Sequence, residues 1–157
     1  MISVISIYNN QKDLIFLKKN IKSIILKILK KEKVFFDEMA IYFVNKKKIS
    51  MLHKQFFQDL SATDCISFPI DSIYKKIRPI YLGDIFICPK IAIEYAKKKK
   101  LNLNEEIILY LIHAILHLLG YDDKEKKKKE IMKKKENSYM KLIKREKLNI
   151  LKKYSNL

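Results

Sequence analysis

The most restrictive feature of this sequence is the run from Ile107 to Tyr121, which contains no aspartate, glutamate, lysine or arginine. In a helical conformation its apolar side chains would lie on almost every side, which is typical of a helix buried at the centre of a fold. The run is shorter than the roughly 20 apolar residues that a membrane span needs. We therefore expect a central, buried helix and no membrane segment.

Polar residues on either side delimit this helix. Asn102 or Asn104 is suited to cap its beginning, and Glu105 and Glu106 would lie in the first turn, where carboxylates interact favourably with the helix dipole. Gly120 is expected just past its end, as glycine commonly is. The predicted helix therefore runs from one of these asparagines to about the residue before Gly120.

Two of the three histidines of the chain lie in this helix, four residues apart. His113 and His117 would occupy one face, one turn apart, which is the arrangement of two imidazoles that bind one metal ion. Beyond Gly120 the chain can turn back and bring Asp122 or Asp123 to the same place. The alternative is a pair of core histidines, but burying them without partners would cost on the order of several kcal/mol. The pattern therefore predicts a metal site.

The rest of the chain alternates between short β-branched runs and helical stripes. Strands are predicted over 2–8, 39–44, 63–68 and 83–88. Helices are predicted over 11–31, 46–57, from 89 to the lysine cluster 97–100, and over 124–153. Together with the central metal-binding helix, this order predicts a single α+β domain over 1–157, with a small mixed sheet of about four strands and about five helices.

The formal net charge of +17 is large for 157 residues. One interpretation is attraction to a polyanion such as RNA. The other is an AT-rich coding sequence, because nearly all basic residues are lysine, with arginine only at Arg78 and Arg145. The lysine-rich run 124–135 has the same two interpretations, a solvated helix face or a contact with the RNA backbone beside the metal site. The charge is compatible with an RNA partner without establishing one.

Three observations predict a cytoplasmic location. The first ten residues lack the basic leader of a secretory signal. Cys65 and Cys88 lie in apolar, strand-like runs without paired spacing, as expected for buried, reduced thiols. The apolar run described above is too short to cross a membrane.

The spacing His-x3-His-x2-Gly-x2-ligand also occurs in the metzincin proteases. Those enzymes carry a glutamate directly after the first histidine, where it acts as the general base. Here that position is Ala114, which cannot accept a proton. A protease of this type is therefore disfavoured.

The motifs resemble those of the YbeY-type endoribonucleases, bacterial rRNA maturation factors whose zinc motif reads His-Gly-x-Leu-His-Leu-x-Gly-Tyr-Asp-His. The resemblance extends from about Ile41 to Tyr139. Outside the zinc motif, the matching residues are Thr63-Asp64, Ser67-Phe68, Gly83-Asp84-Ile85, Met132 and Glu136.

The sequence departs from the family pattern at a few positions. Asp123 replaces the third histidine and is still a competent oxygen ligand for zinc. Ala114 stands where glycine is usual. Phe57 stands where the family often has a basic residue thought to contact RNA, and His53 stands where asparagine is common.

The resemblance implies one Zn²⁺ bound by His113, His117 and Asp123, which would also be the catalytic residues. It implies an endoribonuclease that prefers single strands and acts in maturation of the 16S rRNA 3′ end and in ribosome quality control. RNA and the small ribosomal subunit are the implied partners of a monomeric protein. Two alternatives stay open, namely a ribosome-assembly factor in which zinc only braces the fold, and the metalloprotease.

Several other polar residues have two interpretations. Asp122 is an alternative metal ligand or a hydrogen-bond partner of a histidine. Asp64 and Asp84 are either backbone hydrogen-bond partners or catalytic carboxylates. Ser67 is a candidate phosphate contact, and His53 is interpreted as a surface or groove residue rather than a metal ligand.

Overall fold

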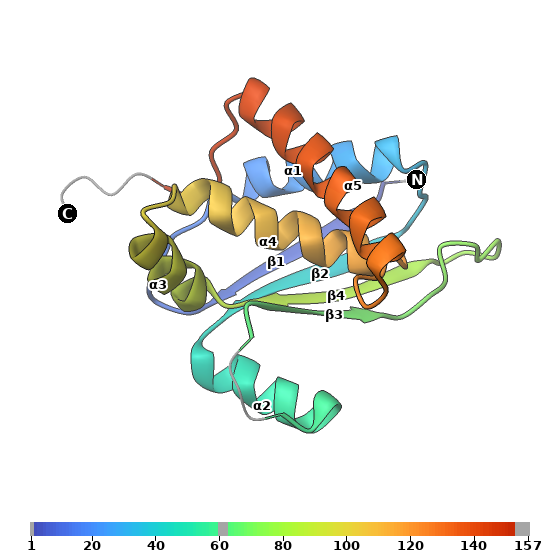
Figure 1. Ribbon diagram of the computed structural model, residues 1–157. Coiled ribbons are helices and arrows are strands. Elements are labelled where there is room, and N and C mark those ends of the chain that lie inside the picture. Colours follow the sequence, from blue (N-terminus) through green and yellow to red (C-terminus); the bar gives the residue numbers. More distant parts are fainter. Residues whose placement is uncertain (1, 60–62, 153–157) are drawn as a thin grey trace.

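The computed structural model describes residues 2–59 and 63–152 (Figure 1). Within these ranges the chain forms one four-stranded mixed sheet with the strand order β1-β2-β4-β3. The pairs β1–β2 and β2–β4 are parallel, whereas the edge strand β3 is antiparallel to β4. The strand bounds are Val4–Asn10 for β1, Glu38–Val44 for β2, Cys65–Pro69 for β3 and Tyr81–Ile87 for β4.

The helices lie on both faces of this sheet. Figure 1 shows α1, α4 and α5 over one face and α2 below the other. Their bounds are Lys18–Lys31 for α1, Lys46–Phe57 for α2, Pro89–Lys99 for α3, Leu103–Leu118 for α4 and Lys126–Arg145 for α5. The expected α+β architecture is confirmed.

The central position predicted for α4 is also confirmed. Ten of its residues are buried, and it packs against β3, β4, α3 and α5. Asn102 caps its beginning, because its side chain accepts a hydrogen bond from the Glu105 amide at 3.0 Å. Asn104 instead holds the C-terminal segment, since its side-chain oxygen accepts from the Ile150 amide at 2.8 Å.

Two helices are shorter than predicted, and one interaction explains both differences. The first helix starts at Lys18 rather than at residue 11, and the last ends at Arg145 rather than at 153, which lies outside the described residues. Beyond α5 the chain turns back along the segment before α1, where Phe16 and Leu151 form a β-bridge and the Leu17 amide donates to the Ile150 carbonyl at 2.7 Å. Ile150 is thereby fully buried. Tertiary pairing has replaced the helical hydrogen bonds that the apolar stripes predicted.

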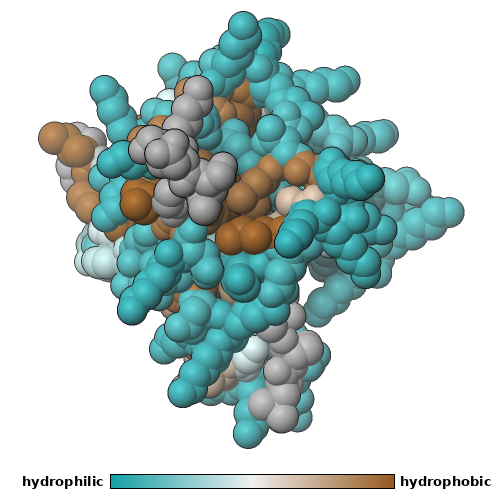
Figure 2. Space-filling model, turned by 90° about the vertical axis from the view of Figure 1, so that its left-hand side faces the viewer, coloured by the Kyte–Doolittle hydropathy of each residue, from teal (hydrophilic) through white to brown (hydrophobic). Residues whose placement is uncertain are grey.

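The remaining sequence predictions on cysteines and membrane segments can be compared with the described residues. Cys65 and Cys88 are free thiols, of which Cys88 is buried as predicted and Cys65 is only partly buried; desolvation raises the pKa of both. None of the described helices is both long and apolar enough to cross a membrane. Figure 2, viewed from the end where α3 lies, shows hydrophilic side chains over most of the surface and hydrophobic ones in a central strip.

Gly83 allows α4 to lie close to the sheet. Its φ is +142°, and a Cβ there would lie 2.3 Å from the Phe68 carbonyl oxygen and 2.7 Å from Cδ1 of Leu118. Gly120 also has a positive φ, +94°, but a Cβ there would meet no atom within 4 Å. A substitution of Gly120 would therefore introduce backbone strain alone, whereas a substitution of Gly83 would add steric overlap.

We predict that Gly83→Ala lowers the free energy of unfolding by about 3 kcal/mol or more, because strain and overlap add. Gly120→Ala should lower it by only about 1–2 kcal/mol, the strain alone. Urea unfolding followed by circular dichroism measures both. Equal losses for the two variants would contradict the close approach of β3, β4 and α4.

Candidate metal centre

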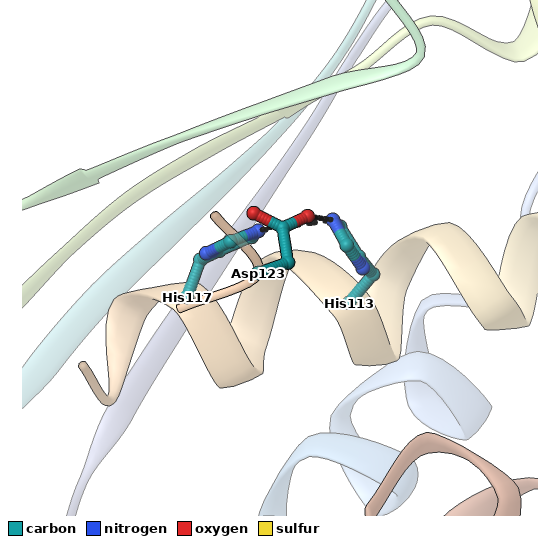
Figure 3. Close-up of side chains that lie close together, drawn as sticks. All are labelled: His113, His117 and Asp123. Carbon is teal, nitrogen blue, oxygen red and sulfur yellow. Dashed lines mark hydrogen bonds and ion pairs between the residues drawn. The ribbon is translucent and has the colours of Figure 1, made fainter. Parts of the chain in front are cut away.

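Three side chains converge at the C-terminal end of α4 (Figure 3). The Nε2 atoms of His113 and His117 lie 3.0 Å apart, and Oδ2 of Asp123 lies 3.7 Å and 3.6 Å from them. A tetrahedral zinc ion, with ligand bonds of about 2.0–2.1 Å, needs ligand atoms about 3.3 Å apart. The spacing fits one such ion, and these residues form a group that could hold a metal.

The turn after α4 brings Asp123 back to the two histidines. The Gly120 amide donates to the His117 carbonyl, and the Tyr121 amide donates to the Leu116 carbonyl, both at 3.0 Å. This pair of bonds is a Schellman motif, in which a residue of positive φ reverses the chain. Gly120 supplies that residue, so the expectation that it ends the helix is confirmed.

Each imidazole is oriented by a hydrogen bond at its other nitrogen. Nδ1 of His113 donates to Oε1 of Glu136 at 2.5 Å, and Nδ1 of His117 donates to the Tyr121 carbonyl at 3.0 Å. With Nδ1 protonated, Nε2 carries the free lone pair that a metal requires. Both Nε2 atoms therefore face the common centre as potential ligands.

Glu136 reaches His113 from α5 and is only 5% exposed. The hydrogen bond with Glu136 raises the pKa of His113 despite burial of the ring. Burial by itself would raise the pKa of Glu136, but its hydrogen bond with His113 and the nearby charges of His113 and Lys133 lower it overall. The carboxylate is thus held ionised beside the imidazole.

A second carboxylate, that of Glu32, contacts the turn after α4 through Tyr121. Glu32, just past the end of α1, accepts hydrogen bonds from the Tyr121 hydroxyl and from Nζ of Lys135, each at 2.8 Å, and from the Tyr139 hydroxyl. Nζ of Lys135 also lies 5.6 Å from the centre of the Tyr121 ring. Burial opposes ionisation of Glu32, but these donors lower its pKa overall. Tyr121, whose carbonyl orients His117, is thereby also held through its ring hydroxyl.

Asp122 points away from this centre. Its carboxylate accepts from the Lys124 amide at 3.1 Å and lies 3.9 Å from Nζ of Lys128. The hydrogen bond from the Lys124 amide lowers the pKa of Asp122. Of the two aspartates that the sequence offered, the structure brings Asp123 to the histidines.

The polar residues of β3 and β4, and Asp64 just before β3, do not join the three converging side chains. The Asp64 carboxylate accepts from the Cys65 amide at 2.8 Å, and the Ser67 hydroxyl donates to the Ala114 carbonyl at 2.7 Å. Alternation along β4 places Asp84 on the opposite face from the buried Ile85. Ser67 therefore ties β3 to α4.

His53 and Phe57 lie on α2, which Figure 1 places on the other face of the sheet from α4. The two rings are 5.3 Å apart, and Nδ1 of His53 lies 4.0 Å from the Asp59 carboxylate. His53 does not join the group formed by His113, His117 and Asp123.

A cleft of about 570 Å³ adjoins the two ligand candidates His113 and Asp123. Its walls come from α3, α4, α5 and residues 63–64, and they include Glu106 and Tyr110. Sequence reasoning did not assign these two residues to a site. The available signal was their position seven and three residues before His113, on the same helix face.

Comparisons with known proteins agree with this architecture. A sequence profile described as Endoribonuclease YbeY matches residues 6–144. A protein of Protochlamydia amoebophila named Endoribonuclease YbeY is 44% identical over 150 residues, which cover 96% of this chain and 99% of the relative. A protein of the same name from Chlamydia felis is 38% identical over 85% of this chain and 86% of its own.

A solved structure has the same fold. The solution structure of TM1509 from Thermotoga maritima superposes with a TM-score of 0.66 at 29% identity, and the match covers 91% of each chain. The profile spans α4 and the turn after it, which carry the converging side chains, and it also spans β2, β3 and β4. On these matches, the chain belongs to the YbeY endoribonuclease family.

Proposed function

We propose that this protein is a metal-dependent endoribonuclease in which His113, His117 and Asp123 bind one Zn²⁺ and carry the catalysis. The convergence of their three ligand atoms, within 3.7 Å of one another, is the observation that supports this most. The family membership supports an activity on RNA. A site of two histidines and one aspartate suits zinc, and it also suits several other first-row ions.

The arrangement suits a reactive site better than a purely structural one. The three protein ligands leave one position of a tetrahedral ion to another ligand, whereas structural zinc sites are usually closed by four protein side chains. The side chains of His113 and His117 are each 29% exposed, and that of Asp123 is 41% exposed. When bound, the ion supplies Lewis-acid chemistry towards a phosphodiester group.

The protein's own groups hold this site in one geometry. Glu136 keeps a proton on Nδ1 of His113, and the Tyr121 carbonyl keeps one on Nδ1 of His117. Lys129 and Lys133 line the adjoining cleft and are suited to bind the phosphates of an RNA strand. These contacts position a substrate without themselves moving a proton.

The biological assignment extends this proposal. We infer that the substrate is single-stranded rRNA, that the enzyme acts in maturation of the 16S rRNA 3′ end and in ribosome quality control, and that it meets the small ribosomal subunit. We further propose a monomer in the cytoplasm. The net charge of +17 and the names of the relatives support an RNA partner.

A protease of the metzincin type needs a general base at position 114, and the residue there offers none. Ala114 is fully buried, and its carbonyl is engaged by the Ser67 hydroxyl. The assembly-factor alternative differs from the proposal only in chemistry, so an assay must separate the two.

We predict that the purified protein cuts labelled single-stranded RNA, that a chelator abolishes the cleavage and that added zinc restores it. Casein, incubated in parallel, should stay intact. Gel electrophoresis measures both. Uncut RNA that is still bound would favour the assembly factor, and cleaved casein would favour the protease.

We predict that Asp123→Ala weakens zinc binding by more than about 100-fold, because removing even a partner of a ligand commonly costs about 10–100-fold. Asp122→Ala is the matched control and should bind zinc as the natural chain does, since its carboxylate faces Lys128. Titration against a chromophoric chelator measures both affinities. A larger loss in the Asp122 variant would reverse the ligand assignment.

We predict that Glu136→Gln weakens zinc binding by about 10–100-fold, because a neutral amide holds the His113 proton less firmly than a carboxylate. Glu130→Gln removes the same charge from an exposed position of α5 and should change nothing. The same titration measures both variants. Unchanged affinity in the Glu136 variant would show that its carboxylate does not support the ligand.

A further inference from the structure

The polar face of α4 continues beyond the metal centre towards the beginning of the helix. Glu106, Tyr110, His113 and His117 are spaced by four, three and four residues, so they form one stripe. With a rise of 1.5 Å per residue, Tyr110 lies about 4.5 Å and Glu106 about 10 Å along the axis from His113. The cleft beside the metal centre lies along this stripe.

The walls of the cleft suit a flat, apolar ring. Ile91 and Tyr95 from α3, Leu109 from α4 and Met132 from α5 line it. Tyr95 is 44% exposed, so its ring is accessible for stacking. Aromatic and apolar side chains of this kind hold the unstacked bases of single-stranded nucleic acids.

Glu106 places a hydrogen-bond acceptor in this apolar cleft. It is only 9% exposed and lines the cleft together with Tyr110, one turn further along α4. A carboxylate has two oxygens and about four lone-pair sites, so it can accept hydrogen bonds from a ligand as well as from a neighbouring hydroxyl. The cleft therefore selects for a ring that carries N–H donors.

Lys129 and Lys133 complete the cleft on the side of α5. Both are exposed, and Nζ of Lys133 also lies 3.3 Å from Oε2 of Glu136. Their charges are suited to the phosphates that flank a bound nucleoside. Base-binding and phosphate-binding groups thus lie beside the same metal centre.

We propose that this cleft binds a guanine base of the RNA strand, next to the phosphodiester at the metal centre, with Glu106 as the residue that reads it. This inference rests on the proposed function and deepens it by naming a base preference. On its Watson–Crick edge guanine carries two adjacent donors, N1–H and the N2 amino group, which match the two oxygens of a carboxylate. Uracil offers one N–H between two carbonyl oxygens, which a carboxylate repels.

Binding of short oligonucleotides to the zinc-loaded full chain tests this, on ice and within a time over which gel electrophoresis shows the probe to be intact. The probes are fluorescent pentauridines with one central guanosine or one central inosine, which differ only in the N2 amino group. Anisotropy titration should give roughly tenfold tighter binding of the guanosine probe, since one good bidentate contact discriminates by about that factor. Equal affinities of the natural chain for the two probes would overturn the proposal.

Two variants test whether Glu106 causes the preference for guanosine over inosine. Glu106→Gln should reduce the guanosine-to-inosine ratio to about one, because an amide pairs a single acceptor with a donor. Glu105→Gln is the matched control, since this neighbouring carboxylate pairs with Lys144 outside the cleft and its loss should leave the ratio unchanged. A ratio that survives in the Glu106 variant would refute its role.

The remaining comparison separates RNA from a free nucleotide. Guanosine monophosphate should bind at least roughly tenfold more weakly than the guanosine probe, because it lacks the flanking phosphates. Equal affinity would assign the cleft to mononucleotides and overturn its assignment to RNA. Because binding needs no cleavage, a chain that discriminates guanosine but cuts no RNA would refute the proposed function and leave this inference intact.

Discussion

The burial of α4 is the constraint on which the rest of the structure depends. Most of its residues lie at the centre of the fold, yet one stripe of the helix carries a glutamate, a tyrosine and two histidines. A polar group away from water must find a hydrogen-bond partner, or it costs a substantial part of the folding free energy. The fold supplies each partner from a different place, namely Glu136 on α5 for His113 and the Tyr121 carbonyl for His117. The hydrogen bonds that satisfy the polar side chains of this buried helix thus also set the geometry of the metal centre.

The hydrogen bonds of Glu32 support the site from outside it. Glu32 gathers two tyrosine hydroxyls and one lysine, and these come from the turn after α4 and from α5. The residue just past α1 is thereby connected to Tyr121, whose carbonyl orients His117. The turn is held at its backbone by the Schellman bonds and at the Tyr121 ring by Glu32, and both imidazoles face one point.

The sequence could predict what depends on local spacing. The interval of four between the histidines, the glycine after them and the apolar stripe of α4 are short-range patterns, and they gave the helix, its end and the two imidazole ligands. Local spacing alone could not separate Asp122 from Asp123, because one residue more or less in the turn changes which carboxylate faces back; the family resemblance favoured Asp123. The role of Glu136, 23 residues from His113, needs the packing of α5 on α4. The early end of α5 could not be predicted from local spacing either, because Ile150 is buried by pairing with a segment more than 130 residues away.

The distribution of charge at the site constrains how an RNA strand can approach it. The chain as a whole carries +17, but Asp64, Glu106, Asp123 and Glu136 all line the cleft. A phosphodiester would be repelled by these carboxylates in a region where water screens charges poorly. It can come close only where positive charge offsets them, which is at a bound cation and along Lys129 and Lys133. The strand should therefore keep its other phosphates on the lysine-lined side and bring a single phosphodiester to the metal. The base of that nucleotide can then enter the apolar part of the cleft. There the carboxylate of Glu106 would accept hydrogen bonds from the N–H groups of the base, which carries no negative charge for it to repel.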